Sequence, residues 1–396
     1  MRRSILNCAA PRWLRGRLTR ARCVGAAGAI LISLMLVGCA SRPGTGVLKP
    51  VEYSAPGAKL VTVYVATTRQ RATLGENIFT AGRSPSLNLA RYTISIPPAH
   101  KKLEIEWPQG GAVDPAISFA TVSHAALTDA DFKLAVQLGP LPRAKREVVI
   151  FVHGYNYNFQ ESLYRMAQLV ADGGIDVSPI LFAWPSEGTI RGYGADKEAV
   201  TYSRDSLAQI LNMVADMPNV GEVGLIGHSM GAWLTVEALR QLRLTRKDRV
   251  IKRLHHVALV SPDIDVNVFR SQMAVIGRLD LPMKQLVSKD DQALSISALL
   301  AGSAGRVGNL DVDDPTVQAL AAARNIQIID ISKMPSTDYM NHDRFIGVST
   351  MLTEIARSGR DSGVGNPAER AGAFVLDSAG AIAASPFKIV RGALPN

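Results

Sequence analysis

Cysteine is scarce in this chain of 396 residues, which contains only three: Cys8, Cys23 and Cys39. The first two lie in an N-terminal segment with the features of a targeting signal, and Cys39 follows it directly. The rest of the chain has no cysteine, which excludes a disulfide framework, a thiolate metal site and a cysteine nucleophile. A covalent nucleophile in this protein is therefore expected to be a hydroxyl group.

Other features are also missing. Closely spaced metal-ligand motifs such as HExxH are absent, so we expect no metal and no cofactor. Residues 1–38 contain no acidic residue but seven of the 44 basic ones. Without those seven, 37 basic residues face 34 acidic ones, so the remaining body is near neutral. Binding to nucleic acid is therefore not expected.

The N-terminal segment predicts export to the cell envelope. Arginines over residues 2–22 precede an apolar run over 23–38, which is shorter than the about 20 residues that comfortably span a bilayer. The run ends in Leu-Val-Gly-Cys, which resembles a bacterial lipobox, in which Cys39 is lipidated and becomes the new N-terminus. An uncleaved signal anchor is the alternative. No Asp follows Cys39, and this resemblance then favours the outer membrane, facing the periplasm.

Composition predicts the organisation of the remaining chain. Residues 39–57 are rich in Pro, Gly and Ser and are expected to be a flexible tether. Residues 58–358 are expected to form one domain. Residues 359–396 are of low complexity and are expected to be largely disordered.

Within the domain, the pattern predicts an α/β fold. Early antiparallel strands are expected at 60–67, 91–98 and 101–108. Strands buried on both faces are expected at 146–156, 178–188, 222–229, 253–265, 284–291 and 325–332, and helices at 159–174, 195–217, 230–244 and 345–357. Alternation of strands and helices predicts a mostly parallel sheet with helices on both faces.

The segment GHSMG over residues 227–231 predicts a serine nucleophile. GxSxG alone is weak evidence, but here an apolar strand precedes Ser229 and a helix follows it, as a nucleophile elbow requires. The helix N-terminus then directs its free N–H groups at any oxyanion formed there.

A serine needs a base, and in the α/β-hydrolase order the base comes after the acid. Of the seven histidines, only His342 follows the last expected strand. His228 adjoins the serine and would face elsewhere, and His153 belongs to the expected oxyanion loop. His255 and His256 open a strand, where packing is the simpler interpretation.

The acid that orients the imidazole has four candidates. Asp290 and Asp291 follow the strand that comes after the SPDID segment (residues 261–265). This is the usual position of the acid in this fold, and Asp291 is favoured. Asp263 and Asp265 are alternatives, although capping of the helix expected near residue 266 would explain them.

An oxyanion hole requires two backbone N–H donors. Met230, the residue after the nucleophile, is expected to supply one. Tyr155, in the HGYN segment at the end of the first buried strand, is expected to supply the other, with Asn156 as the alternative.

Seven spaced segments over residues 60–357 carry a resemblance to a known family: VTVYVATTR, ISIPPAH, VIFVHGYNYNF, LFAWPSEG, GHSMGAW, LVSPDID and SKDDQAL. They resemble a bacterial α/β-hydrolase family of unknown function that includes many lipoproteins. The resemblance implies the α/β-hydrolase fold, with Ser229 as nucleophile, Asp291 as acid and His342 as base. The NHDRF segment around His342 departs from the Gly-His-x-aromatic pattern expected there.

The expected activity is cleavage of an acyl ester, with thioesters and lipids as further possibilities, in a protein tethered to the envelope membrane. A non-catalytic envelope binding protein that keeps the fold is the alternative. Segments 186–196 and 295–324 are expected to wall the site. Within the second, ISALLAG (296–302) is either a short lid helix or, as we favour, core. The aromatic residues near strand ends, Tyr155, Tyr157, Trp184 and Trp233, fit either the pocket lining or packing.

Overall fold

The structure is a computed structural model that describes residues 42–73, 75–109, 113–139, 145–303, 305–349, 372–376 and 382–384. The chain divides after Gly44 into two units, and the first is described only over residues 42–44. All helices and strands belong to the second unit, Thr45–Asn396. Cys39 and the expected signal peptide lie outside the described residues.

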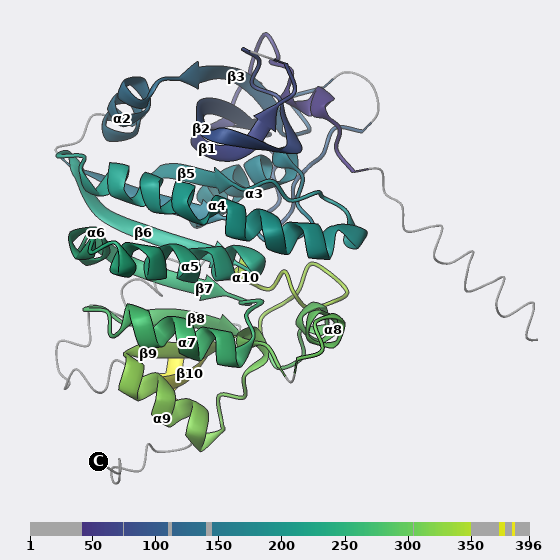
Figure 1. The fold of residues 1–396 in the computed structure, drawn as a ribbon. Coiled ribbons are helices and arrows are strands. Elements are labelled where there is room, and N and C mark those ends of the chain that lie inside the picture. The colour runs from purple at the N-terminus through teal and green to yellow at the C-terminus, as the bar shows by residue number, and fades with distance from the viewer. Residues whose placement is uncertain are drawn as a thin grey trace, which may run out of the picture. The chain divides into compact units, whose positions relative to one another are not determined.

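One sheet of eleven strands forms the centre of this unit (Figure 1). In chain order the strands are β1 Lys59–Arg71, β2 Phe79–Ile96, β3 Ala120–Leu127, β4 Arg146–Val152, β5 Ser178–Ala183, β6 Val220–His228, β7 Leu254–Val260, β8 Met283–Val287, β9 Ile326–Asp330, β10 Gly372–Leu376 and β11 Ile382–Ala384. Their spatial order is β11-β10-β9-β8-β7-β6-β4-β5-β1-β2-β3. From β10 to β1 every pairing is parallel, whereas β2, β3 and β11 add antiparallel edges.

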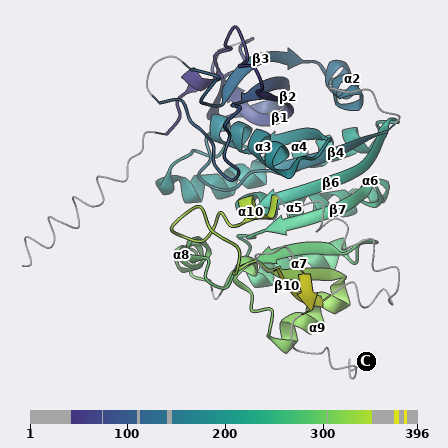
Figure 2. The same cartoon turned by 180° about the vertical axis from the view of Figure 1, so that it is seen from behind.

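Helices cover both faces of the sheet, as the sequence predicts (Figures 1 and 2). The helices are α2 Asp129–Leu138, α3 Phe159–Gly173, α4 Tyr193–Ala215, α5 Met230–Leu244, α6 Asp248–Lys252, α7 Val266–Ile276, α8 Gln292–Leu300, α9 Pro315–Arg324 and α10 Phe345–Ser349, with 3-10 turns η1 Thr45–Leu48, η2 Ile190–Gly192 and η3 Val307–Asn309. One apolar core lies under α4, α5 and α7, and a second lies under α3 and α10. Because each core buries one face of the same strands, the strands have the near-continuous apolar sequences from which they were predicted.

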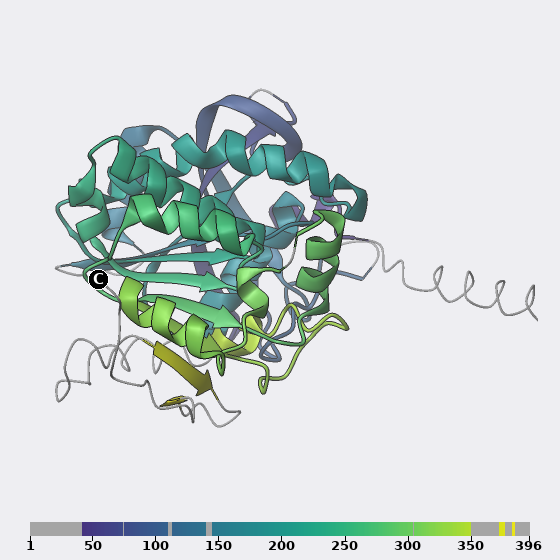
Figure 3. The ribbon, with the colours of Figure 1, turned by 60° about the horizontal axis from the view of Figure 1, so that its bottom comes forward.

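The central parallel strands all end on the same side of the molecule (Figure 3). The loops that follow β4, β6, β8 and β9 therefore meet at one edge of the sheet, which is where α/β folds place their sites. The predicted nucleophile, acid, base and oxyanion loop are all in these loops.

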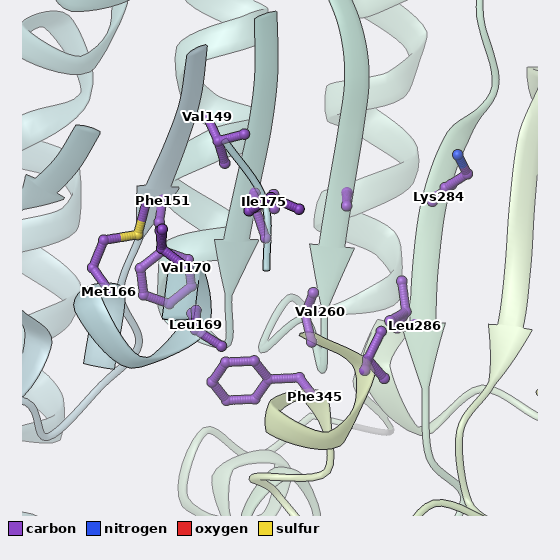
Figure 4. Close-up of a pocket in the computed structure, with 13 residues that line it drawn as sticks. Val149, Phe151, Met166, Leu169, Val170, Ile175, Val260, Lys284, Leu286 and Phe345 are labelled. Atoms are coloured by element: carbon purple, nitrogen blue, oxygen red, sulfur yellow. The ribbon is translucent and has the colours of Figure 1, made fainter. Parts of the chain in front are cut away.

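An apolar pocket lies on the α3 side of the sheet (Figure 4). It is lined by strand residues such as Phe151, Val260 and Leu286, by Met166 of α3, and by Phe345 of α10. None of its lining residues is a predicted site residue, so we do not place a substrate there.

The strand expected at 101–108 is not formed, and that prediction is wrong. Leu103 has a positive φ of 73°, and side-chain carboxylates bind the backbone of this segment in place of a neighbouring strand. Leu103 N–H donates to Asp172 at 2.8 Å, and Lys101 N–H donates to Glu106 at 2.8 Å. The alternating apolar residues pack individually, as Trp107 does by stacking on Tyr164.

The expected flexible tether over residues 39–57 also needs correction, because its second half packs on the domain. Leu48 of η1 is buried, and the Val47 carbonyl accepts hydrogen bonds from the hydroxyls of Thr121 and Tyr164 at 3.0 and 2.7 Å. The ordered body therefore begins at Thr45.

At the C-terminal end, less of the chain is described. Strands β10 and β11 fall within the segment predicted to be largely disordered, and the rest of that segment lies outside the described residues. Helix α10 begins at Phe345, as expected, and the continuation predicted to residue 357 also lies outside them.

Candidate active site

Ser229 occupies the turn between β6 and α5 in a strained conformation. Its φ and ψ are 55° and −120°, a region that residues other than glycine rarely adopt. The surrounding backbone holds it there. Ser229 N–H donates to the Val260 carbonyl at 2.9 Å, and its own carbonyl accepts from Asp263 N–H at 3.2 Å. This is the geometry of a nucleophile elbow.

The two glycines of the elbow are required by close backbone contacts. A Cβ added at Gly231 would lie 2.3 Å from the carbonyl oxygens of both Val152 and His153. A Cβ added at Gly227 would lie 2.7 Å from the Cα of Ala232. The start of α5 is thereby pressed against the end of β4, which brings the oxyanion loop next to the serine.

Asp291 and His342 lie in hydrogen-bonding contact although 51 residues separate them. Asp291 is fully buried after β8, and its Oδ2 is 2.7 Å from His342 Nδ1. Its Oδ1 accepts from Leu294 N–H at 3.0 Å and so caps the N-terminus of α8. His342 follows β9, and its backbone N–H donates to Asp338 at 2.9 Å. One carboxylate therefore fixes the orientation of the imidazole and the start of a helix.

The charged form of His342 is stabilised by its surroundings. Burial acts to lower the pKa of the ring, but the charge and hydrogen bond of Asp291 outweigh it, with smaller contributions from Asp343 and Asp263, and raise the pKa of His342 to about 9. A carboxylate that stabilises imidazolium in this way is what a histidine base requires once it has taken a proton.

His342 lies beside the elbow. Its ring centroid is 4.8 Å from that of His228, the residue immediately before Ser229. The His228 ring also packs on Phe345 at 4.1 Å, and burial holds the pKa of His228 well below its usual range. His228 is thus a neutral packing residue that connects the elbow to the loop carrying His342.

The other three acid candidates have different partners. Asp290 binds Arg344, with one contact at 2.8 Å, and Asp265 caps α7. Asp263 is ion-paired with Arg306 at 2.8 Å. Of the four candidates, Asp291 alone hydrogen-bonds a histidine among the described residues.

The backbone after β4 lies against the elbow. A Cβ added at Gly154 would be 3.0 Å from the Cβ of Ser229. Met230 is the first residue of α5, and the first N–H groups of a helix have no intrahelical acceptor. Asn156 has a φ of 61°, and its N–H donates to Asp196 at 3.5 Å.

Two buried charged residues that hold this loop were not identified from the sequence. Asp196, at the start of α4, also accepts from the Ser186 hydroxyl at 2.6 Å and from Glu187 N–H at 2.8 Å. Arg69 of β1 donates to the Tyr157 carbonyl at 2.9 Å. Neither residue belongs to a motif, so no sequence signal indicates that these side chains hold the loop after β4.

A second unpredicted cluster lies beside the elbow and involves α8. Asp263, Arg306 and the hydroxyls of Tyr193 and Ser297 form one hydrogen-bonded group, in which Tyr193 and Ser297 are 2.8 Å apart. These residues come from the loop after β7, the start of α4, α8 and the turn before η3. The cluster therefore fixes α8 against the centre of the site.

Two of the four aromatic residues near the strand ends, Trp184 and Tyr157, pack on His153. Trp184 is fully buried, donates from its indole to the His153 carbonyl at 2.7 Å, and stacks on the His153 ring. Tyr157 also packs beside His153. Burial, followed by the charge of Arg69, lowers the pKa of His153 to about 3, so this histidine is neutral.

The segment ISALLAG is not core, and that prediction is wrong. Ser297 faces inward, but Leu299 and Leu300 of the same segment are 81% and 67% exposed. The buried face of α8 consists of Leu294 and Ser297, and Ser297 joins the Asp263–Arg306 cluster. Ile296, Leu299 and Leu300 lie on the exposed side of the helix.

Within the described ranges, no group of three or more His, Cys, Asp or Glu side chains is arranged to hold a metal ion. Within the same ranges, no helix has both the length and the hydropathy needed to span a membrane.

Residues 135–358 match the family described as "Alpha/beta hydrolase of unknown function (DUF900)". The match covers more than half of the chain and includes every predicted catalytic and oxyanion residue. An uncharacterized protein of Nostoc sp. is 25% identical over 166 residues, which cover 31% of this chain and 43% of that relative. The aligned region is therefore less than half of the curated relative.

Solved structures of hydrolases are similar at a lower level. A lipase-esterase related protein of Clostridium acetobutylicum has 12% identity and a TM-score of 0.30, covering 54% of this chain and 95% of its own. A carboxyl esterase of Tuber melanosporum has 10% identity and a TM-score of 0.29, covering 87% of both chains. At such low identity and TM-score, neither similarity bears on the activity of this chain.

Proposed function

This chain belongs to the DUF900 family of alpha/beta hydrolases, and on that premise we propose that it is a serine hydrolase that cleaves acyl esters through a covalent acyl-enzyme. In this proposal Ser229 is the nucleophile, His342 the general base and Asp291 the acid. The single observation that supports it most is the bond between Asp291 and His342 beside a strained serine elbow.

The proposed first step is acylation. His342 Nε2 takes the proton from the Ser229 hydroxyl while the serine oxygen attacks the ester carbonyl carbon, and the carbonyl oxygen becomes an oxyanion. The imidazolium then gives this proton to the leaving alkoxide, which departs as an alcohol and leaves Ser229 acylated. In the second step the same imidazole takes a proton from a water molecule, whose oxygen attacks the acyl carbon. The imidazolium then returns this proton to the Ser229 oxygen as the bond between that oxygen and the acyl carbon breaks, which releases the carboxylic acid.

The oxyanion is expected to bind two backbone N–H groups, those of Met230 and Tyr155. The position of Met230 at the start of α5 supports the first choice because the helix dipole favours negative charge there. The contact between Asn156 N–H and Asp196 supports Tyr155 over Asn156, since Asn156 N–H is directed toward a carboxylate.

We further propose that the protein is attached to the envelope membrane through a lipid on Cys39. This part rests on the sequence alone. Small-molecule or lipid acyl esters are then the expected substrates.

Labelling with a fluorophosphonate probe tests the nucleophile directly. The parent protein should be labelled and should hydrolyse p-nitrophenyl esters, whereas Ser229→Ala should do neither. Ser295→Ala, an exposed serine on α8, is the matched control and should still be labelled. If a folded parent protein is not labelled and cleaves no ester, the chain is a binding protein with this fold; if Ser229→Ala retains both properties, the nucleophile is another residue.

A further inference from the structure

Exposed apolar side chains are concentrated around the candidate active site. Among the described residues, five large apolar side chains are at least 67% exposed. Four of them, Ile190, Leu299, Leu300 and Tyr339, come from three segments, namely η2, α8 and the loop after β9 that carries His342. Ile296 and Met340, at 44% and 40%, extend the same group. We call these six residues the apolar rim.

Hydrogen bonds show that the three segments of the apolar rim, η2, α8 and the loop after β9, are neighbours. Gln292 N–H, at the start of α8, donates to the Met340 carbonyl at 2.8 Å. On its inner side, α8 is bound through Ser297 to Tyr193, three residues after Ile190. On α8 itself, Ile296, Leu299 and Leu300 have the i, i+3, i+4 spacing of one helix face. The rim is therefore one surface built by three segments around one site.

The charge pattern of α8 indicates what this surface contacts. No charged residue occurs between Asp291 and Arg306, and both of these side chains are buried. An uncharged helix with its apolar face in solvent is unusual in a soluble protein, and exposed apolar patches of this kind mark contact with a protein or membrane. Because no carboxylate projects from this helix face, nothing there repels phosphate headgroups.

The position of the chain start favours a membrane. Figures 1 and 2 show η1, the purple first element, on the same side of the molecule as α8, although η1 lies beside β1 to β3 and α8 lies well below it. Only five residues separate Thr45, where η1 begins, from Cys39. At about 3.5 Å per residue this connection spans roughly 20 Å. A lipid on Cys39 would therefore hold the side that carries the rim close to the bilayer.

We propose that the apolar rim docks on a lipid surface, and that the acyl esters cleaved at Ser229 are lipids presented in that surface. The proposal rests on the proposed hydrolase function for its substrate and on the rim for its docking. In the docked position, Leu299 and Leu300 enter the boundary between lipid headgroups and acyl chains. The acyl chain of a lipid then moves from the lipid layer into the site without crossing water.

The test uses the full chain with Cys39→Ala as its parent, so that no lipid anchor contributes, and adds one of two leucine pairs to that parent. Leu299→Ser with Leu300→Ser changes the rim. Leu134→Ser with Leu138→Ser is the matched control, because these α2 leucines are 57% and 58% exposed at the opposite end of the molecule (Figures 1 and 2). Thermal unfolding verifies that both variants are folded.

Two readouts separate docking from catalysis. Flotation with vesicles of equal parts phosphatidylcholine and phosphatidylglycerol should show the rim variant bound about tenfold more weakly than the parent, with the control pair unchanged. The ratio of the rate on a diacylglycerol ester in those vesicles to the rate on dissolved p-nitrophenyl butyrate should fall by a similar factor in the rim variant alone.

The outcomes are distinct. If the rim variant floats more weakly and neither the parent nor either variant cleaves an ester, the result would support docking and reject the proposed activity. Equal flotation of parent and rim variant overturns the docking proposal, whatever the activity. A parent dimer that the rim substitutions convert to monomer, with flotation unchanged, would assign the rim to contact between two copies and also overturn it.

Discussion

At the scale of single residues, the site depends on an imidazole whose charge is stabilised before any substrate arrives. Asp291 is fully buried and gives its two oxygens to His342 and to the start of α8, so it has no freedom to reorient. The ring of His342 is consequently fixed with Nδ1 toward the carboxylate. Its Nε2 is then the nitrogen that remains for proton transfer.

The first prediction concerns the pH dependence of activity. The base acts only when neutral, so kcat/KM should rise with pH through the pKa of His342, about 9 in the resting protein. Asp291→Asn removes the stabilising charge and should move this midpoint to lower pH while reducing kcat by about 10³–10⁴-fold. A pH–rate profile of both proteins measures this, with Asp290→Asn as control. An unmoved midpoint in Asp291→Asn would assign the acid to another residue.

The same group predicts a pH-dependent stability. The folded pKa of His342 lies above its ordinary value of 6.5, so its contribution is fully present below about 6.5 and is lost as pH rises through about 9. The free energy of unfolding of Ser229→Ala should therefore fall between pH 7 and 10. Adding Asp291→Asn should flatten that part of the curve, as urea titrations at each pH would show. An equal slope in the double variant would contradict the coupling.

The positions of the candidate residues could be predicted from residue order. Ser229 lies between β6 and α5, as its strand–turn–helix context predicts, and His342 follows β9. Their catalytic roles stay predictions. Between Asp290 and Asp291 the sequence offered little, because the choice depends on which carboxylate turns inward. In the structure Asp290 binds Arg344, and Asp291 hydrogen-bonds His342. Arg69 and Asp196 were missed because neither belongs to a motif, and their partners, the Tyr157 carbonyl for Arg69 and Ser186, Glu187 and Asn156 for Asp196, are brought to them only by the fold.

At the scale of elements, the elbow determines how α5 meets β4. Glycine is required at position 231 because two carbonyl oxygens lie where a side chain would begin. Backbone atoms of a central strand cannot move aside as a flexible side chain does. The packing of the start of α5 on the end of β4 therefore fixes the position of Ser229, the proposed nucleophile.

Gly231→Ala should therefore separate α5 from the loop after β4. We expect at least about a tenfold loss of fluorophosphonate labelling and a lower melting temperature, since overpacking costs about 1–3 kcal/mol. Gly194→Ala is the matched control: this glycine lies in α4, and no atom lies within 4 Å of the position its new methyl group would take, so labelling and melting should be preserved. Normal labelling by Gly231→Ala would show that the elbow tolerates a displaced helix.

Element predictions were best where burial imposes a simple pattern. The strands from β4 to β9 were recognised because burial on both faces requires continuous apolar residues. The segment 101–108 alternates like a strand, yet its backbone is bound by carboxylates of Glu106 and Asp172. The ISALLAG segment of α8 was assigned to the core for its apolar residues, whereas its buried residue is Ser297, which hydrogen-bonds the buried Asp263–Arg306 pair. Alternation and hydropathy do not reveal such partners.

At the scale of the whole molecule, the body begins at Thr45 and the expected lipid attachment lies just before it. The packing of η1 on α3 and β3 shows that residues 45–48 of the predicted tether belong to the body. If Cys39 carries the proposed lipid, only five residues separate it from this body.

The lipid attachment can be tested separately from the rim. Mass spectrometry of the mature parent should show a lipid on an N-terminal Cys39, and Cys39→Ala should lose that mass and shift markedly from the membrane fraction to the soluble fraction. Ser41→Ala serves as the neighbouring control. A mature chain that retains residues 1–38 without a lipid would instead identify an uncleaved signal anchor.

The double role of Asp291 has a mechanical consequence. The Asp291 carboxylate hydrogen-bonds both the start of α8 and the imidazole of His342. A tilt of α8 would therefore also displace His342, the proposed proton acceptor. A force applied to the outer leucines of α8 by a lipid layer would reach His342 through the Asp291 carboxylate and through the hydrogen bond from Gln292 N–H to the Met340 carbonyl. Contact of α8 with the lipid layer would then change the position of the His342 ring, without movement of a domain.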